Sequence, residues 1–160
     1  MATNAEKKLK AGDKAPAFSL KDQNGNVFAS ENLAGSRFLV YFYPRASTPG
    51  CTVQACSVRD SLPDFERLGL KVLAISPDQP EKLKKFDEKQ GLGFTLLSDP
   101  DMSIAMAFGV VGEKTSFGKT SIGIIRSSFL IDERGGVIEA WYKVKPEETV
   151  PLALEKKGAQ

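Results

Sequence analysis

The two cysteines of this 160-residue chain, Cys51 and Cys56, stand five positions apart. Cys51 follows Pro49 and Gly50, at the point where the spacing of apolar residues becomes helical, so we expect its thiol at a helix N-terminus. The positive end of the helix dipole and the unpaired backbone N–H groups there stabilise an anionic thiolate. A stabilised thiolate with a second thiol close behind it indicates redox chemistry.

Three other uses of a cysteine pair fit this sequence less well. In a regular helix the Cα atoms of residues i and i+5 lie about 8.7 Å apart, whereas a disulfide needs about 6.8 Å or less. A static disulfide would therefore unwind the first helical turns, which suits a switch better than a staple. The chain has no histidine to complete a zinc site, and disulfide exchangers of the thioredoxin type carry Cys-x-x-Cys. We expect no metal and no cofactor.

The remaining interpretation is a thiol peroxidase. The Cys51 thiolate would attack one oxygen of a peroxide and become a sulfenic acid. Cys56 would then condense with it to a disulfide, releasing water, and an external dithiol would reset the pair. Thr48 can bring its hydroxyl to the sulfur or the peroxide, and Pro44 stiffens the covering loop. Arg126 is the candidate for a fixed positive charge, although its position is equally that of an ordinary surface arginine. The residues alone thus lead to a redox-active cysteine pair on a helix start.

The elements that must position these residues alternate between strands and helices. Continuous apolar runs at residues 37–43 and 71–75 predict central strands buried on both faces. Helical spacing at residues 53–68 is interrupted by Pro63, where the helix should kink or restart. Residues 112–123 have no periodicity and are predicted to form a loop. The other expected elements are strands at 17–21 and 26–29 around an Asn-Gly turn, a helix at 80–90, a strand at 95–97, a helix at 100–108, a hairpin at 127–132 and 137–142, and a terminal helix at 146–156. This order predicts an α/β layered fold with a mixed sheet.

Composition describes an ordinary globular chain with 41% hydrophobic and 26% charged residues. We expect one domain over residues 1–160, with residues 1–11 as a flexible leader. The formal net charge of +2 is too small to indicate nucleic-acid or membrane binding. No run is long and apolar enough to span a bilayer, and the first 12 residues lack the apolar region of a signal peptide. We therefore expect a cytoplasmic protein, a setting in which a cysteine pair is more often redox-active than structural.

Residues 41–56, YFYPRASTPGCTVQAC, contain the pattern Pro-x-x-x-Thr-x-x-Cys from Pro44 to Cys51. This pattern resembles the active-site motif of the peroxiredoxins. The longer stretch is similar to the bacterioferritin comigratory protein, or Q-type, subfamily. Supporting matches along the chain are GDKAPAF at 12–18, ISPD at 75–78, LSDP at 97–100, GEK at 112–114 and GIIRSSFLID at 123–132.

The resemblance implies a thioredoxin-like fold with a mixed central sheet flanked by helices and an extra N-terminal β-hairpin. It implies that Thr48 and Pro44 shape the pocket, that Arg126 lies beside the thiolate, and that Cys56 is the resolving cysteine. Gln54, where relatives carry Glu or Gln, would either hydrogen-bond near the pocket or lie on a solvated helix face.

The same resemblance implies the substrates and the reductant. The substrates would be hydrogen peroxide and small organic hydroperoxides, and the reductant thioredoxin or a similar dithiol protein. We expect a monomer, because a resolving cysteine within the chain removes any chemical need for a dimer. The alternative is a redox-sensing or chaperone-like binding protein that uses the Cys51–Cys56 disulfide as a switch.

Overall fold

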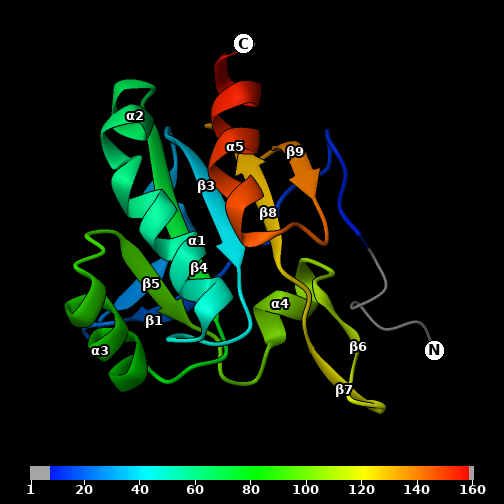
Figure 1. The fold of residues 1–160 in the computed structure, drawn as a ribbon. Helices are drawn as coiled ribbons and strands as arrows, with labels where there is room; N and C mark the ends of the chain where they lie inside the picture. Colours follow the sequence, from blue (N-terminus) through cyan, green and yellow to red (C-terminus); the bar gives the residue numbers. More distant parts are fainter. Residues whose placement is uncertain (1–7, 159–160) are drawn as a thin grey trace.

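A seven-stranded mixed sheet forms the centre of the structure (Figure 1). The computed structural model describes residues 8–158. The strands follow the order β2-β1-β5-β4-β3-β8-β9, with β3, β4 and β5 parallel and the outer pairs antiparallel. Their bounds are β1 Ser19–Asp22, β2 Val27–Ala29, β3 Arg37–Phe42, β4 Leu70–Ser76, β5 Thr95–Ser98, β8 Ser127–Ile131 and β9 Val137–Trp141. The mixed sheet and the N-terminal hairpin β1–β2 agree with the prediction.

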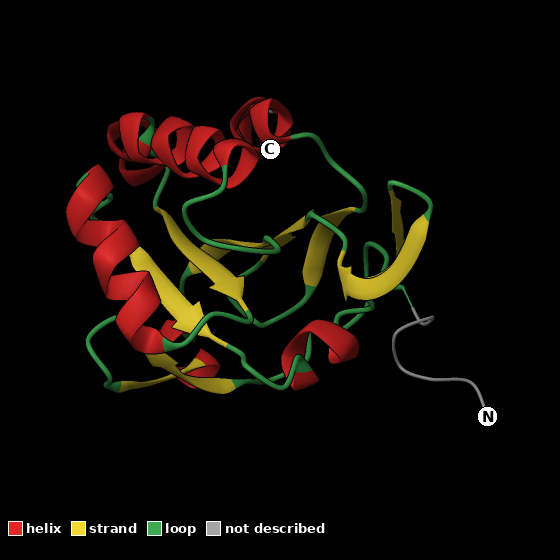
Figure 2. Cartoon of the chain, turned by 60° about the horizontal axis from the view of Figure 1, so that its bottom comes forward, coloured by secondary structure: helices red, strands yellow, loops and turns green. Residues whose placement is uncertain are grey.

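Helices cover both faces of this sheet, but unequally. Helices α1 (Pro49–Asp60), α2 (Leu62–Arg67), α3 (Pro80–Gln90) and α5 (Thr149–Gly158) contribute side chains to the core on one face. Helix α4 (Ser103–Ala107) packs on the other face. In Figure 2 the sheet runs between a group of helices at the top and a short helix at the bottom. Each face therefore encloses its own hydrophobic core.

Strand β3 supplies aromatic side chains to both cores, as its apolar sequence predicts. Leu39, Tyr41 and, directly after the strand, Tyr43 belong to the core beneath α1, whereas Phe38, Val40 and Phe42 belong to the opposite one. All six are at most 6% exposed. Successive side chains of a strand point to opposite faces, so a strand buried on both sides must be apolar throughout.

The helical segment after Cys51 breaks before Pro63, as predicted. Helix α1 ends at Asp60 and α2 begins at Leu62, with Ser61 between them at φ −103° and ψ 2°. Proline lacks an N–H and would clash with the preceding helical turn, so it is accommodated in the first turn of α2. The break separates the cysteine-bearing helix from a shorter one.

The loop predicted over residues 112–123 is wrong. Strands β6 (Val111–Ser116) and β7 (Lys119–Ile124) form a separate two-stranded hairpin, which projects at the lower right of Figure 1 beside α4. Its two turn residues, Phe117 and Gly118, have φ of 53° and 77°, as a tight hairpin turn requires. Much of β7 is exposed, so the sequence carries no alternation of apolar and polar residues.

Two helix starts lie later than the proline positions indicate. Helix α4 begins at Ser103, not at residue 100, because the Asp99 carboxylate accepts hydrogen bonds from the backbone of Ile104 and Ala105. The terminal helix begins with a 3₁₀ turn, η3 (Pro146–Glu148), before α5. A further 3₁₀ turn, η2 (Ser30–Leu33), precedes β3.

The expected leader falls partly outside the described residues, which begin at residue 8. Within its second part, the Leu9 backbone N–H donates to Tyr142 Oη at 2.8 Å. Leu9 also packs against the core of the α4 face. No helix within residues 8–158 combines the length and the apolar character needed to cross a bilayer.

Candidate active site

Cys51 lies at the start of α1, directly beyond the carboxyl end of β3. Its side chain is 1% exposed and its thiol is free. Together with Gln54, Ala55 and Val58 it forms the buried stripe of α1, at the i, i+3, i+4 and i+7 spacing of one helix face. The side chain of the N-cap residue, Thr48, makes no capping hydrogen bond at this helix start. The first N–H groups of a helix have no partner within the helix, so this helix start can donate to a negatively charged atom beside it.

Arg126 reaches this sulfur from a distant part of the chain. Its Nη1 lies 3.4 Å from Cys51 Sγ and donates to Gln54 Oε1 at 2.6 Å. Gln54 is completely buried, and its Nε2 donates to Thr149 Oγ1 at 2.7 Å. The guanidinium is thus held by a side chain on the same helix as the thiol, and that side chain is held in turn by α5. Gln54 therefore lies at the pocket and not on a solvated helix face.

Sheet pairing explains why Arg126 arrives here. It precedes β8, whose first residue, Ser127, pairs with Phe42 at the end of β3. The Arg126 carbonyl accepts a hydrogen bond from the Val144 backbone at 2.9 Å. A β-carbon on Gly50 would lie 3.2 Å from Arg126 Nη2 and 3.3 Å from Pro146 Cγ. Glycine at this position therefore permits the close approach of the arginine to the helix start.

The loop between β3 and α1 is held by Asp78, two residues beyond the end of β4. Asp78 Oδ2 accepts hydrogen bonds from the Ala46 backbone at 2.7 Å and from Ser76 Oγ at 3.0 Å. Its own carbonyl accepts from Ser98 Oγ at 2.6 Å. Ser47 takes the left-handed conformation, at φ 66°. The carboxylate holds the loop in a shape that its sequence alone does not favour.

Thr48 and Pro44 lie on this loop. Thr48 is the N-cap residue of α1, and its backbone carbonyl accepts the first helical bond, from Thr52 at 2.8 Å. The Thr48 hydroxyl donates to the Arg45 carbonyl at 2.8 Å. Because the hydrogen is directed at Arg45, the oxygen retains its lone pairs for accepting a hydrogen bond. Pro44 is half-buried beside the end of β3.

The sequence of this chain matches a known protein family. Residues 11–140 match the AhpC/TSA family. This chain is a member of that family. Peroxiredoxin Bcp of Escherichia coli is 56% identical over 129 residues, which cover 81% of this chain and 83% of that protein. The chain is therefore an enzyme of the peroxiredoxin type, a thiol peroxidase.

Solved structures agree with this assignment. A Xylella fastidiosa PrxQ mutant superimposes with a TM-score of 0.88 at 32% identity, covering 94% of this chain and 96% of the other. The bacterioferritin comigratory protein of Xanthomonas campestris, from a study of its alkyl peroxide reduction activity, gives a TM-score of 0.83 at 37% identity, with 89% and 90% covered. The fold is thioredoxin-like α/β, with a mixed sheet flanked by helices, as the sequence predicted.

Lys114 is a second cation near the thiol of this peroxiredoxin, and it is not among the site residues predicted from the sequence. It lies on β6 and is partly buried. Burial, followed by the positive charge of Arg126, lowers the pKa of Lys114, while the negative form of Cys51 opposes that shift. A β-carbon on Gly123, on the facing strand, would lie 3.4 Å from Lys114 Cδ. The Gly-Glu-Lys triplet was the available signal.

Two tyrosines of the same core accompany the peroxiredoxin thiol. Tyr41 and Tyr43 are each 1% exposed and pack in the cluster that contains Cys51. Burial raises the pKa of both phenols well above the usual range. They therefore remain neutral and supply an apolar, water-excluding environment rather than charge.

Cys56 is free as well, and it faces away from Cys51. Five residues along a helix correspond to a rotation of about 140°. The Cys56 thiol lies 3.5 Å from Gln90 Oε1, at the end of α3. The structure thus places both cysteines on one intact helix of the peroxiredoxin, without a disulfide between them.

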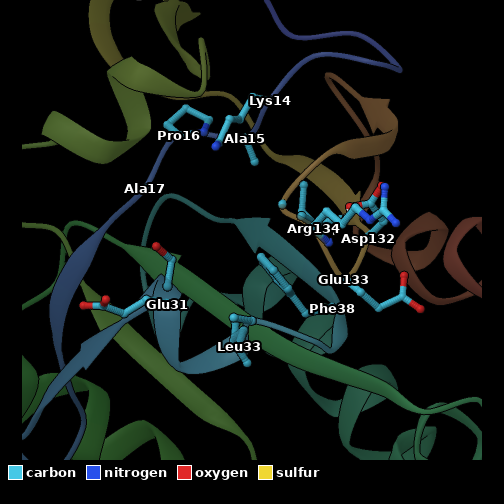
Figure 3. Close-up of a pocket in the computed structure, with 14 residues that line it drawn as sticks. Lys14, Ala15, Pro16, Ala17, Glu31, Leu33, Phe38, Asp132, Glu133 and Arg134 are labelled. Atoms are coloured by element: carbon cyan, nitrogen blue, oxygen red, sulfur yellow. Dashed lines mark hydrogen bonds between the residues drawn. The ribbon is translucent and has the colours of Figure 1, made fainter.

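A cavity of about 330 Å³ lies at the opposite end of the sheet. Its lining includes Phe38 at the start of β3 and the paired Ile131 at the end of β8. Figure 3 shows charged residues at its rim, among them Glu31, Asp132 and Arg134. Six residues of β3 span about 20 Å, so this cavity is separate from the peroxiredoxin thiol.

Proposed function

We propose that this chain reduces hydrogen peroxide and organic hydroperoxides through a sulfenic acid on Cys51, that Cys56 resolves this acid as an intramolecular disulfide, and that thioredoxin or a similar dithiol protein reduces the disulfide. One observation supports this above all others. The buried Cys51 sulfur at a helix start lies 3.4 Å from Arg126 Nη1. A thiolate there has a fixed counter-charge and little competing water.

In the first step the Cys51 thiolate attacks one oxygen of the peroxide, and the O–O bond breaks. Sulfur is oxidised to the sulfenic acid, and the second oxygen leaves as an alcohol or water after taking up a proton. The Arg126 guanidinium and the free N–H groups at the start of α1 stabilise the negative charge that develops on the departing oxygen. The Thr48 oxygen accepts a hydrogen bond from the peroxide O–H, and Pro44 limits access of water.

In the second step Cys56 attacks the sulfenic acid of Cys51. A sulfur–sulfur bond forms, the sulfur–oxygen bond breaks, and the oxygen leaves as water. Because the intact helix holds the two Cα atoms about 8.7 Å apart, α1 must unwind locally before the disulfide can form. An external dithiol then reduces the Cys51–Cys56 disulfide by thiol–disulfide exchange, and the dithiol is itself oxidised to a disulfide.

Substrate and setting follow the same proposal. The alkyl peroxide reduction activity of the Xanthomonas campestris protein supports organic hydroperoxides as substrates here. We propose that the chain acts as a single domain and a monomer in the cytoplasm, since the resolving cysteine is internal and a reducing compartment supplies the dithiol.

Steady-state peroxide consumption with thioredoxin, its reductase and NADPH tests this function. The parent should turn over repeatedly, and Cys51→Ser should consume no peroxide. Cys56→Ser should react once and leave one oxygen on Cys51, visible by mass spectrometry. Dithiothreitol in place of thioredoxin separates the chemistry from the choice of reductant.

Two outcomes would contradict the proposal. Turnover retained in Cys51→Ser would exclude the assigned nucleophile. A parent protein that reacts once and stalls with every dithiol would favour the redox-sensing or chaperone-like alternative.

A further inference from the structure

A second set of contacts lies on the α3 side of α1, away from the peroxide-facing sulfur. Cys56 Sγ contacts Gln90 Oε1 at 3.5 Å. One turn further along α1, Arg59 Nη1 donates to the Gln90 backbone carbonyl at 2.6 Å. Both contacts from α1 therefore end on a single residue, the last of α3.

The end of α3 is a firm anchor for these contacts. Gly91 ends the helix in the left-handed conformation at φ 58°, with its N–H on the Asp87 carbonyl at 2.7 Å. The Asp87 carboxylate accepts from Gln23 Nε2 at 3.1 Å, which ties the helix end to the segment after β1. Leu83 and Phe86 are buried in the core. The last carbonyls of a helix lack helical partners and favour a cation, and Arg59 supplies one to Gln90.

Disulfide formation has to break at least one of these contacts. Cys56 must approach Cys51 by about 2 Å or more between Cα atoms, from the helical value of about 8.7 Å to the disulfide limit of about 6.8 Å. Its thiol then leaves Gln90, and the turn that carries Arg59 is strained or unwound. The two contacts thus restrain the conformational change that the second chemical step requires.

We propose that Arg59 and Gln90 are positioning residues that clamp Cys56 in the intact helix and thereby set the lifetime of the Cys51 sulfenic acid. This inference rests on the proposed function, because it requires Cys56 to be the resolving thiol. A longer lifetime gives a second peroxide time to react: the sulfenic acid gains one more oxygen to become a sulfinic acid, and the peroxide leaves as alcohol or water. The clamp therefore also sets the peroxide concentration at which the enzyme is inactivated.

A positive charge at Arg59 would by itself accelerate the attack of Cys56 on the sulfenic acid, but the contacts of Arg59 weaken this effect. A cation one turn from Cys56 would favour its thiolate and so accelerate the attack. However, Arg59 Nε pairs with the Asp60 carboxylate at 2.9 Å, and the arginine side chain is 34% exposed. The carboxylate and the solvent offset the field of the guanidinium. The restraint on helix unwinding is then the larger effect.

The test compares Arg59→Met and Gln90→Leu with the parent. Reduced protein is mixed with one equivalent of hydrogen peroxide and quenched at intervals with an alkylating agent and dimedone, and the species are counted by mass spectrometry. Both variants should shorten the sulfenic acid lifetime about three- to tenfold, the effect of losing one solvent-weakened hydrogen bond. The rate of sulfenic acid formation should not change. Sulfinic acid formed per turnover at high peroxide should fall by the same factor.

Arg67→Met is the matched control. Arg67 lies on α2, is 71% exposed and pairs with Asp64, so the change in charge is the same but no contact with α3 is lost. Its sulfenic acid lifetime should equal that of the parent. A longer or unchanged lifetime in Arg59→Met would overturn the clamp. An unchanged lifetime in Gln90→Leu, which alters no charge, would overturn it independently.

The result for Cys56→Ser separates this inference from the proposed function. If the sulfenic acid of that variant decays as fast as in the parent, Cys56 is not the resolving thiol and the proposed second step fails. If it persists while Arg59→Met behaves as the parent, only the clamp fails.

Discussion

Replacing Gln54 with leucine should leave Arg126 without its anchor beside the thiol, while both Cys51 and Arg126 are retained. Gln54 accepts from Arg126 at 2.6 Å and donates to Thr149 at 2.7 Å. It is fully buried, so water cannot replace either partner. Leucine fills a similar volume but makes no hydrogen bond.

The size of the effect follows from these two bonds. The charge-assisted bond to Arg126 is worth about 1.5–3 kcal/mol and the neutral bond to Thr149 about 0.5–1.5 kcal/mol. Burial of the apolar leucine side chain stabilises the folded state by about 1–2 kcal/mol. The net loss of folding stability is therefore about 1–3 kcal/mol. Without its anchor, the Arg126 side chain must be ordered in the transition state. The loss of side-chain conformational entropy then adds about 1.5–2 kcal/mol to the activation free energy. The rate constant for oxidation of the thiol should fall about 10- to 30-fold.

Two measurements check this prediction. Competition against a reference peroxidase gives the second-order rate constant for oxidation by hydrogen peroxide. Denaturant unfolding of the reduced protein gives the stability. Because the thiolate remains at the helix start, some reactivity should survive, in contrast to the complete loss expected for Cys51→Ser.

Thr149→Val is the control that identifies the path of the effect. It removes the bond to Gln54 but keeps the bond between Gln54 and Arg126. Stability should fall by about 0.5–1.5 kcal/mol, and the rate constant should stay within about threefold of the parent. A parent-like rate in Gln54→Leu would refute the reasoning. An equally large loss in Thr149→Val would show that packing of α5, and not the anchoring of Arg126, controls the rate.

Three further predictions concern the same helix start. Gly50→Ala should slow thiol oxidation about tenfold with little loss of stability, because its β-carbon would displace Arg126 from a distance of 3.2 Å; a parent-like rate would contradict this. Burial lowers the pKa of Lys114, so as pH rises this cation is lost earlier than an ordinary lysine, and the oxidation rate should fall. That alkaline decline should be absent from the pH–rate profile of Lys114→Met, and its persistence would exclude Lys114 as the cause. Disulfide formation should increase amide hydrogen exchange over residues 51–59, and equal exchange in both redox states would mean that the helix need not open.

Local features of the fold could be predicted because their causes are local. Pro49 and Gly50 mark the start of α1, and Pro63 marks its interruption, since proline constrains φ and removes a donor wherever the chain runs. The apolar run of β3 indicates burial on both faces before any partner strand is known. The hairpin β6–β7 was not predicted because it lacks such a local signal. Its exposed strands show no alternation of apolar and polar residues, and its turn depends on two residues with positive φ.

The amino-acid sequence by itself determined where the reactive sulfur lies on its helix, because a proline, a glycine and a change of apolar period are read within a few residues. Only the tertiary structure decided what surrounds that sulfur. Arg126 is 75 positions from Cys51, and Thr149 is 95 positions from Gln54. They meet because β8 pairs with the end of β3 and α5 packs against α1. Such contacts depend on the pairing and packing of whole elements, which no short stretch of residues specifies.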